Sequence, residues 1–139
     1  MSKLTLVLFI ISFAFCAAAQ SRERVIVVAH LTEQPTSISK SEIRNIFMGG
    51  VSEAKLSPVE IASGSQIRII FNTRVIGLPE SRIQSYWAQM KFSGRNQPPV
   101  SVSNTEEMVR YLTENEASIG YLPEGIALPE PLTILFTTN

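Results

Sequence analysis

Hydrophobic and polar positions along the chain predict short strands separated by helices. Five apolar runs have the length of a strand, and the first of them is β-branched without alternation. Such a run is expected of a strand that is buried on both faces of a sheet. The five expected strands cover residues 25–29, 58–61, 100–102, 118–122 and 132–136.

Between these runs, apolar residues recur at helical spacing. Capping boxes at Ser39 with Glu42 and at Ser103 with Glu106 mark two helix starts. The four expected helices cover roughly residues 39–49, 65–77, 79–94 and 103–115 and end at glycine or asparagine. Strands that alternate with helices predict the α/β class, here a single three-layer lobe with a largely parallel or mixed sheet.

The N-terminus follows a different pattern. Lys3 precedes a largely apolar run of a dozen residues, and a row of alanines ends at Ala19. A basic head, an apolar run and small residues at the cleavage site predict a secretory signal peptide. The run is too short to cross a bilayer, which takes about 20 apolar residues. We therefore expect residues 1–19 to be a cleaved signal peptide and residues 20–139 one periplasmic or secreted domain, without stable membrane insertion.

Cys16 leaves one alternative open, because a bacterial lipoprotein would keep it as an acylated first residue. Phe15 stands directly before it, where that signal needs a small residue. Cleavage after Ala19 removes the only cysteine of the chain. Core packing alone must then stabilise the exported domain, and about 120 residues suffice for that.

Composition narrows the range of functions. The chain has 12 Lys and Arg against 12 acidic residues, all of them Glu. A neutral balance without a basic block argues against a nucleic-acid partner. His30 is the only imidazole, and no Asp or Cys is at hand to orient it or to complete a metal site. We therefore expect no enzymatic activity, no metal and no cofactor, and a structural or solvated His30.

The segment Ser63-Gly64-Ser65 carries the most informative chemistry. It lies between an expected strand and an expected helix, and a helix N-terminus attracts anions. Arg68 follows within one turn, where an anion would offset its unfavourable position. The alternative is that a serine merely caps the helix and that Arg68 is a solvated surface charge. The candidate anion site consists of Ser63, Gly64, Ser65 and Arg68.

Other residue patterns are less specific. Tyr86 with Trp87, and Phe92 with Lys91, could form a stacking platform for a ring, although aromatic residues at helical spacing are more often core. The glutamates are dispersed, and no carboxylate pair stands out.

Five segments follow one another in a characteristic order. They are Ser41–Gly50 (SEIRNIFMGG), Ser63-Gly64-Ser65 before a helix with Phe71, Tyr86-Trp87, Phe92-Ser93-Gly94 and Ala117–Tyr121 (ASIGY). In this order they resemble the phosphate-binding proteins of ABC transporters, which are type 2 periplasmic binding proteins. The resemblance covers roughly residues 25–136. It implies an exported, non-enzymatic solute-binding lobe, with phosphate or a similar oxyanion at Ser63-Gly64-Ser65, in an ABC-type uptake system.

The sequence departs from that family in three respects. The family has two lobes, and this chain has length for one. The Arg that usually precedes the family's loop is replaced by Glu60-Ile61-Ala62, and the ligand-contacting Asp has no counterpart. Half a cleft needs a homodimer or another protein to complete it, and these are the expected partners besides the oxyanion. The alternative function is a periplasmic protein–protein interaction or accessory module that kept the lobe and lost the ligand.

Overall fold

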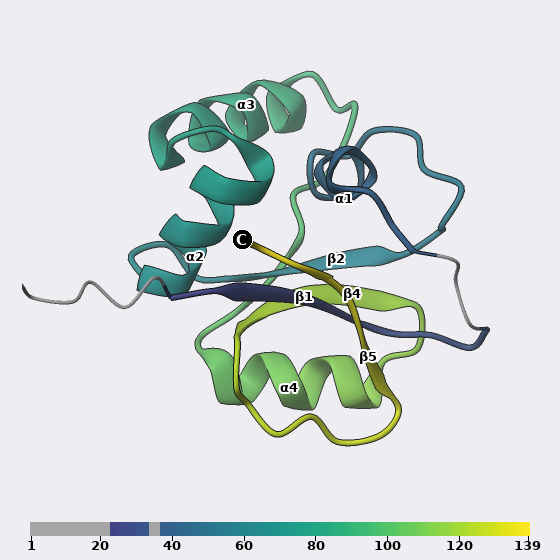
Figure 1. Ribbon diagram of the computed structural model, residues 1–139. Helices are drawn as coiled ribbons and strands as arrows, with labels where there is room; N and C mark the ends of the chain where they lie inside the picture. Colours follow the sequence, from purple (N-terminus) through teal and green to yellow (C-terminus); the bar gives the residue numbers. More distant parts are fainter. Residues whose placement is uncertain (1–22, 34–36) are drawn as a thin grey trace, which may run out of the picture.

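The computed structural model describes residues 23–33 and 37–139, which form one five-stranded sheet with helices on both faces (Figure 1). The expected signal peptide and Cys16 lie outside the described residues. The strands are β1 (Val25–His30), β2 (Ser57–Ile61), β3 (Val100–Val102), β4 (Ser118–Pro123) and β5 (Leu132–Thr137). The helices are α1 (Lys40–Phe47), α2 (Gln66–Phe71), the π-helix η1 (Asn72–Ile76), α3 (Glu80–Phe92) and α4 (Thr105–Glu114).

The sheet is mixed, with the strand order β3-β2-β4-β1-β5. β2 pairs parallel with β3 and β4, whereas β1 runs antiparallel to both β4 and β5. Val25 to Ala29 are all buried, as the unbroken β-branched run predicts. The expected α/β class and three-layer lobe are confirmed, and of the two expected sheet types the mixed one is present.

Two layers of helices enclose this sheet. α1, α2 and α3 cover one face, and α4 covers the other (Figure 1). On the first face Phe71 stacks on Tyr121 with ring centroids 4.0 Å apart, and Phe47 packs against Phe71 at 4.8 Å. On the second face Gly120 allows α4 to lie close to β4, because a Cβ there would collide with the sulfur of Met108. The core thus has an aromatic centre on one side and an aliphatic helix on the other.

The start of α1 agrees with the sequence, and that of α4 is displaced by one residue. Ser39 Oγ accepts the N–H of Glu42 at 3.1 Å, as a capping box predicts. In α4, Asn104 Oδ1 accepts the N–H of Glu107 at 2.9 Å, and the Glu107 carboxylate accepts the N–H of Ser103 at 2.8 Å. The predicted pair of Ser103 with residue 106 is wrong, because the asparagine one residue later is an equally good cap.

The helix expected to run unbroken to Gly77 changes its pitch after Phe71. The N–H of Gly77 donates to the carbonyl of Asn72 at 2.7 Å, five residues back, which is the hydrogen bond of a π-helix. Gly77 has a φ of +76° and ends the helix as expected. The wider turn keeps Asn72, Val75 and Ile76 buried together.

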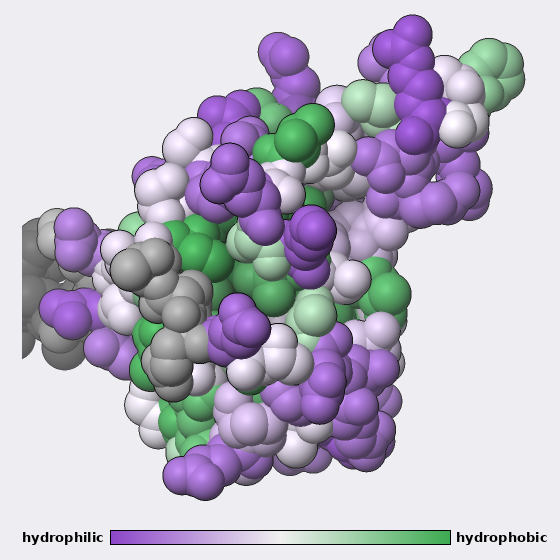
Figure 2. Space-filling view, turned by 90° about the vertical axis from the view of Figure 1, so that its right-hand side faces the viewer, coloured by the Kyte–Doolittle hydropathy of each residue, from purple (hydrophilic) through white to green (hydrophobic). Residues whose placement is uncertain are grey.

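The parallel strands define two ends of the molecule. The carboxyl ends of β2, β3 and β4 lie at one edge of the sheet, on the left in Figure 1. The first and last strands meet there too, because Val25 N–H donates to Thr138 Oγ1 at 3.0 Å and Thr138 N–H donates to the Val25 carbonyl at 2.9 Å. Figure 2 shows the opposite end, where apolar side chains gather in the middle of the face. There Leu31, Ile38 and Leu56 line part of a hollow of about 350 Å³.

The Tyr121 side chain links β4 to β2. Its hydroxyl accepts the buried N–H of Ile61 at 2.9 Å, and burial raises the pKa of Tyr121 above its usual range. Tyr121→Phe leaves that N–H without an acceptor. We expect the free energy of unfolding to fall by about 1–3 kcal/mol in urea denaturation. The control Tyr111→Phe, at a half-buried residue of α4, should change it by less than about 0.5 kcal/mol. Equal losses in both variants would contradict this role.

Candidate functional site

Ser63-Gly64-Ser65 forms the turn between β2 and α2, at the carboxyl edge of the sheet. Ser63 and Gly64 are exposed, and Ser65 is half-buried. Ser65 occupies the N-cap position of α2, but its hydroxyl makes no capping hydrogen bond. Gly64 has a φ of +92° with open space around its Cα. The turn therefore presents uncharged hydroxyl groups and backbone to the solvent.

The turn lies beside the start of α4. The N–H of Ala62 donates to the carbonyl of Val102 at 2.8 Å, which joins the ends of β2 and β3. α4 begins shortly afterwards with Glu106 and Glu107 in its first turn. Hydrogen bonds from Ser103 hold the pKa of Glu107 below its usual range. The helix start beside the turn thus carries negative charge, whereas the turn itself carries none.

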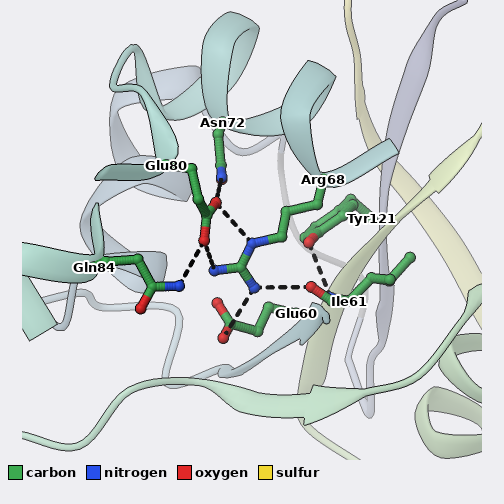
Figure 3. A network of polar contacts seen from close by, with 7 residues as sticks. All are labelled: Glu60, Ile61, Arg68, Asn72, Glu80, Gln84 and Tyr121. Atoms are coloured by element: carbon green, nitrogen blue, oxygen red, sulfur yellow. Dashed lines mark hydrogen bonds and ion pairs between the residues drawn. The ribbon is translucent and has the colours of Figure 1, made fainter. Parts of the chain in front are cut away.

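Arg68 lies buried between two carboxylates (Figure 3), with 4% of its surface exposed. Its Nε and Nη2 donate to the two carboxylate oxygens of Glu80 at 2.9 and 2.8 Å. Its Nη1 lies 3.1 Å from Oε1 of Glu60 and donates to the carbonyl of Ile61 at 2.8 Å. The expectation of a solvated Arg68 is wrong, and the anions that match its charge belong to the chain itself.

Two amides hold Glu80 in place against this guanidinium. Asn72 Nδ2 donates to Oε2 of Glu80 at 2.7 Å, and Gln84 Nε2 donates to Oε1 at 2.8 Å (Figure 3). Glu80 is also the first residue of α3, where the helix dipole favours a carboxylate. The π-helix contributes Asn72 to this network, so the altered pitch of η1 bears directly on the site.

The two carboxylates respond oppositely to the same cation. Burial raises the pKa of Glu60, and the nearby Arg68 offsets that rise only in part. The hydrogen bond from Arg68 lowers the pKa of Glu80, which is less buried and also bound by Gln84 and Asn72. For Arg68 itself, burial opposes the charge, but the hydrogen bonds and charges of Glu80 and Glu60 raise its pKa above the ordinary value. Glu60 is therefore the member of the cluster that takes up a proton first.

The ion pairs are not sealed from water. A shallow hollow of about 280 Å³ adjoins them and is lined by Glu60, Gln84 and Lys91, among others. Water can therefore reach the Glu60 carboxylate, whose side chain is 18% exposed.

The remaining candidate residues have structural or surface positions. His30 Nδ1 lies 2.8 Å from the carbonyl of Leu112, which confirms the structural interpretation and requires the proton on Nδ1. Trp87 is core, and the Tyr86 hydroxyl donates to the carbonyl of Met48 at 2.7 Å. Phe92, expected as core, is 96% exposed at the last position of α3, so that expectation is wrong.

Sequence reasoning missed the pair of Glu60 and Glu80. Arg68 offered the one signal that could have revealed it. It directly follows Ile67 and precedes Phe71 by three residues, so it falls on the buried stripe of its own helix. A buried arginine requires carboxylate partners.

Two features that would point to other functions are absent from the described ranges, 23–33 and 37–139. No helix there has the length and apolar character needed to cross a membrane. Nor does this part of the chain gather three or more His, Cys, Asp or Glu residues around a point where a metal ion could sit.

No known protein family matches the sequence, and none of the curated proteins does. The structure, however, is similar to an ABC-type phosphate transport receptor from Vibrio cholerae, with a TM-score of 0.59 and 12% sequence identity. It is also similar to PstS from Borrelia burgdorferi, with a TM-score of 0.55 and 15% identity. The fold is that of the phosphate receptors.

The similarity covers 81% and 74% of this chain, but 45% and 41% of the two receptors. The chain thus spans less than half of the length of either receptor. The expected relation in fold to periplasmic binding proteins for phosphate is confirmed. In this phosphate-receptor fold, the turn Ser63-Gly64-Ser65 follows β2, and Arg68 is held by the chain's own carboxylates.

Arg68 should dominate the stability of this part of the fold. Arg68→Met leaves two carboxylates facing each other without their cation, so we expect the free energy of unfolding to fall by about 3–5 kcal/mol. Urea denaturation measures the loss. Arg82→Met, at an exposed arginine of α3, is the matched control and should be near neutral. A loss below about 1 kcal/mol for Arg68→Met would show that the network adds nothing.

The opposite pKa shifts predict opposite pH dependences for two amide variants. The pKa of Glu80 is lower in the folded protein than in the unfolded chain, where it is near 4.5. The charge of Glu80 therefore adds stability above pH 4.5, and this stability is lost as the pH falls through the folded pKa. Glu80→Gln should therefore be less stable than wild type at pH 7, by an amount that shrinks below pH 4.5. The folded pKa of Glu60 is raised, so its ionisation opposes folding. Glu60→Gln should be at least as stable as wild type at pH 7, and the stabilities of the two proteins should converge below pH 4.5.

Thermal unfolding followed by circular dichroism between pH 3 and pH 8 tests both variants. If the unfolding temperatures of Glu60→Gln and Glu80→Gln depend on pH in the same way, the asymmetry between the two carboxylates is refuted.

Proposed function

We propose that this chain is an exported, non-catalytic solute-binding domain that binds phosphate or a similar oxyanion at Ser63-Gly64-Ser65 and serves an ABC-type uptake system. The position of the turn carries the proposal. It lies at the carboxyl ends of parallel strands, where open α/β sheets bind their ligands, in a fold similar to that of phosphate receptors.

The chemistry of the turn suits an oxyanion. The first backbone N–H groups of a helix have no acceptor within the helix, so those at the start of α2 can bind an anion, and the hydroxyls of Ser63 and Ser65 add donors. Gly64 has no side chain to keep an anion from the backbone. The turn has no cation of its own, because Glu60 and Glu80 occupy Arg68. Binding should be weak, since hydrogen bonds at an exposed site replace those to water.

One observation favours a second function, that of an interaction module that kept the lobe without its ligand. Arg68 is paired within the chain, and the start of α4 beside the turn carries Glu106 and Glu107, so neither of these neighbours offers a free cation to an anion in the turn. In that case the carboxyl edge binds another protein, and that protein needs no negative charge at the contact.

Calorimetric titration with phosphate, and with sulfate for comparison, tests the first function. The protein is purified from cells that express the whole chain. We expect saturable binding near one to one, with a dissociation constant on the order of 1 mM, about −4 kcal/mol. Ser65→Glu places a carboxylate in the turn and should abolish the heat by charge repulsion. Ser85→Glu, at an exposed serine of α3, is the matched control and should bind as wild type does.

Circular dichroism of both variants checks that they remain folded. Absence of heat from wild type up to about 10 mM phosphate, tenfold above the expected constant, would reject ligand binding and leave the interaction module.

A further inference from the structure

The outermost strands β3 and β5 run along the two sides of the sheet, and these side edges are distinct from the carboxyl edge where the parallel strands end. The two side edges differ in how they are protected against pairing with another chain. β3 forms one edge and has three residues, and a short edge strand is a common way to prevent pairing with other chains. β5 forms the other edge with six residues, and among residues 23–33 and 37–139 it pairs only with β1. Its outer side therefore presents unpaired backbone groups, which are a template for another strand.

β5 lacks the charged residues and the proline that usually protect such an edge, although its pairing with β1 shifts register between Val27 and Val28. From Leu132 to Asn139 the sequence contains no charged residue and no proline. Four of the six residues of the strand are large and apolar, and none of them is buried. Ile134 is 49% exposed, and Leu132, Leu135 and Phe136 are partly covered by the core. By contrast, the neighbouring β1 is buried along almost its whole length.

We propose that β5 pairs with the β5 strand of a second copy of this chain, antiparallel about a two-fold axis. An uncharged strand meets no like-charge repulsion when it faces itself, and identical edges form a closed, self-complementary contact. Pairing satisfies the outer backbone groups of both strands and covers the half-exposed apolar side chains of each. The two sheets then join into one continuous sheet across the axis.

This dimer is independent of the oxyanion site. β5 and β2 lie three positions apart in the sheet, with β4 and β1 between them. An antiparallel two-fold contact at β5 reverses the strand direction between the copies, so their carboxyl edges point to opposite ends. Neither copy covers the turn Ser63-Gly64-Ser65 of the other. The dimer therefore leaves each half-cleft open and does not complete it.

Sedimentation velocity between roughly 10 and 500 μM protein tests the proposal. One pair of strands buries less than the roughly 1,200 Å² of stable complexes, so the association should be weak and a wide range of concentrations is needed to detect it. The apparent mass should rise towards twice that of a single chain as concentration increases. Ile134→Lys places a charge on the edge and should weaken the association at least about tenfold. Ile69→Lys, at an isoleucine of α2 with 46% exposure, is the matched control and should associate as wild type does.

Hydrogen exchange on the wild-type protein supplies a second measurement that needs no variant. Amides of residues 132–137 should exchange more slowly as the protein concentration rises, and those of β3 should not change. A protein that stays monomeric throughout would overturn the proposal and leave the β5 edge to a strand of another protein. A dimer that survives Ile134→Lys, or that Ile69→Lys also disrupts, would place the contact elsewhere and overturn it as well.

Discussion

A guanidinium buried between two carboxylates joins the three elements around the candidate site. Arg68 belongs to α2, Glu60 to β2 and Glu80 to α3, so a shift of any one element separates charges that cannot be left unpaired in the interior. The turn Ser63-Gly64-Ser65 connects β2 to α2 and is fixed at both ends by this cluster. Its geometry therefore depends on an interaction to which the turn itself contributes no side chain.

The same interaction determines what kind of ligand site the fold can offer. Two carboxylates share one guanidinium, so the cluster has a negative balance and no positive charge for a bound anion. Recognition of the proposed oxyanion at the turn would rest on the helix dipole, backbone N–H groups and hydroxyls. Such donors suit oxyanions by shape and hydrogen bonding more than by charge. The resemblance to phosphate receptors concerns the fold, whereas the site has its own electrostatics.

Much of the fold follows from local sequence, and most of the site does not. Strands and helices were predictable because apolar spacing and caps such as Ser39 act over a few residues. That Glu60 and Glu80 share Arg68 was not predictable from spacing, since it depends on how α3 is placed relative to β2 and α2. Phe92 shows the same limit, because helical spacing alone does not reveal whether another element packs against the last residue of a helix. The position of the turn Ser63-Gly64-Ser65 between β2 and α2 was predictable, because the signals that end a strand and start a helix are local.

The reciprocal hydrogen bonds between Val25 and Thr138 have a consequence for how this lobe can be connected to other chains. The two strands that enter and leave the lobe do so side by side, so a linker of a few residues could join them. The lobe is then suited to circular permutation, with new ends opened at an exposed loop. It is equally suited to insertion as a cassette into a host protein, whose chain would leave and resume at nearly the same point.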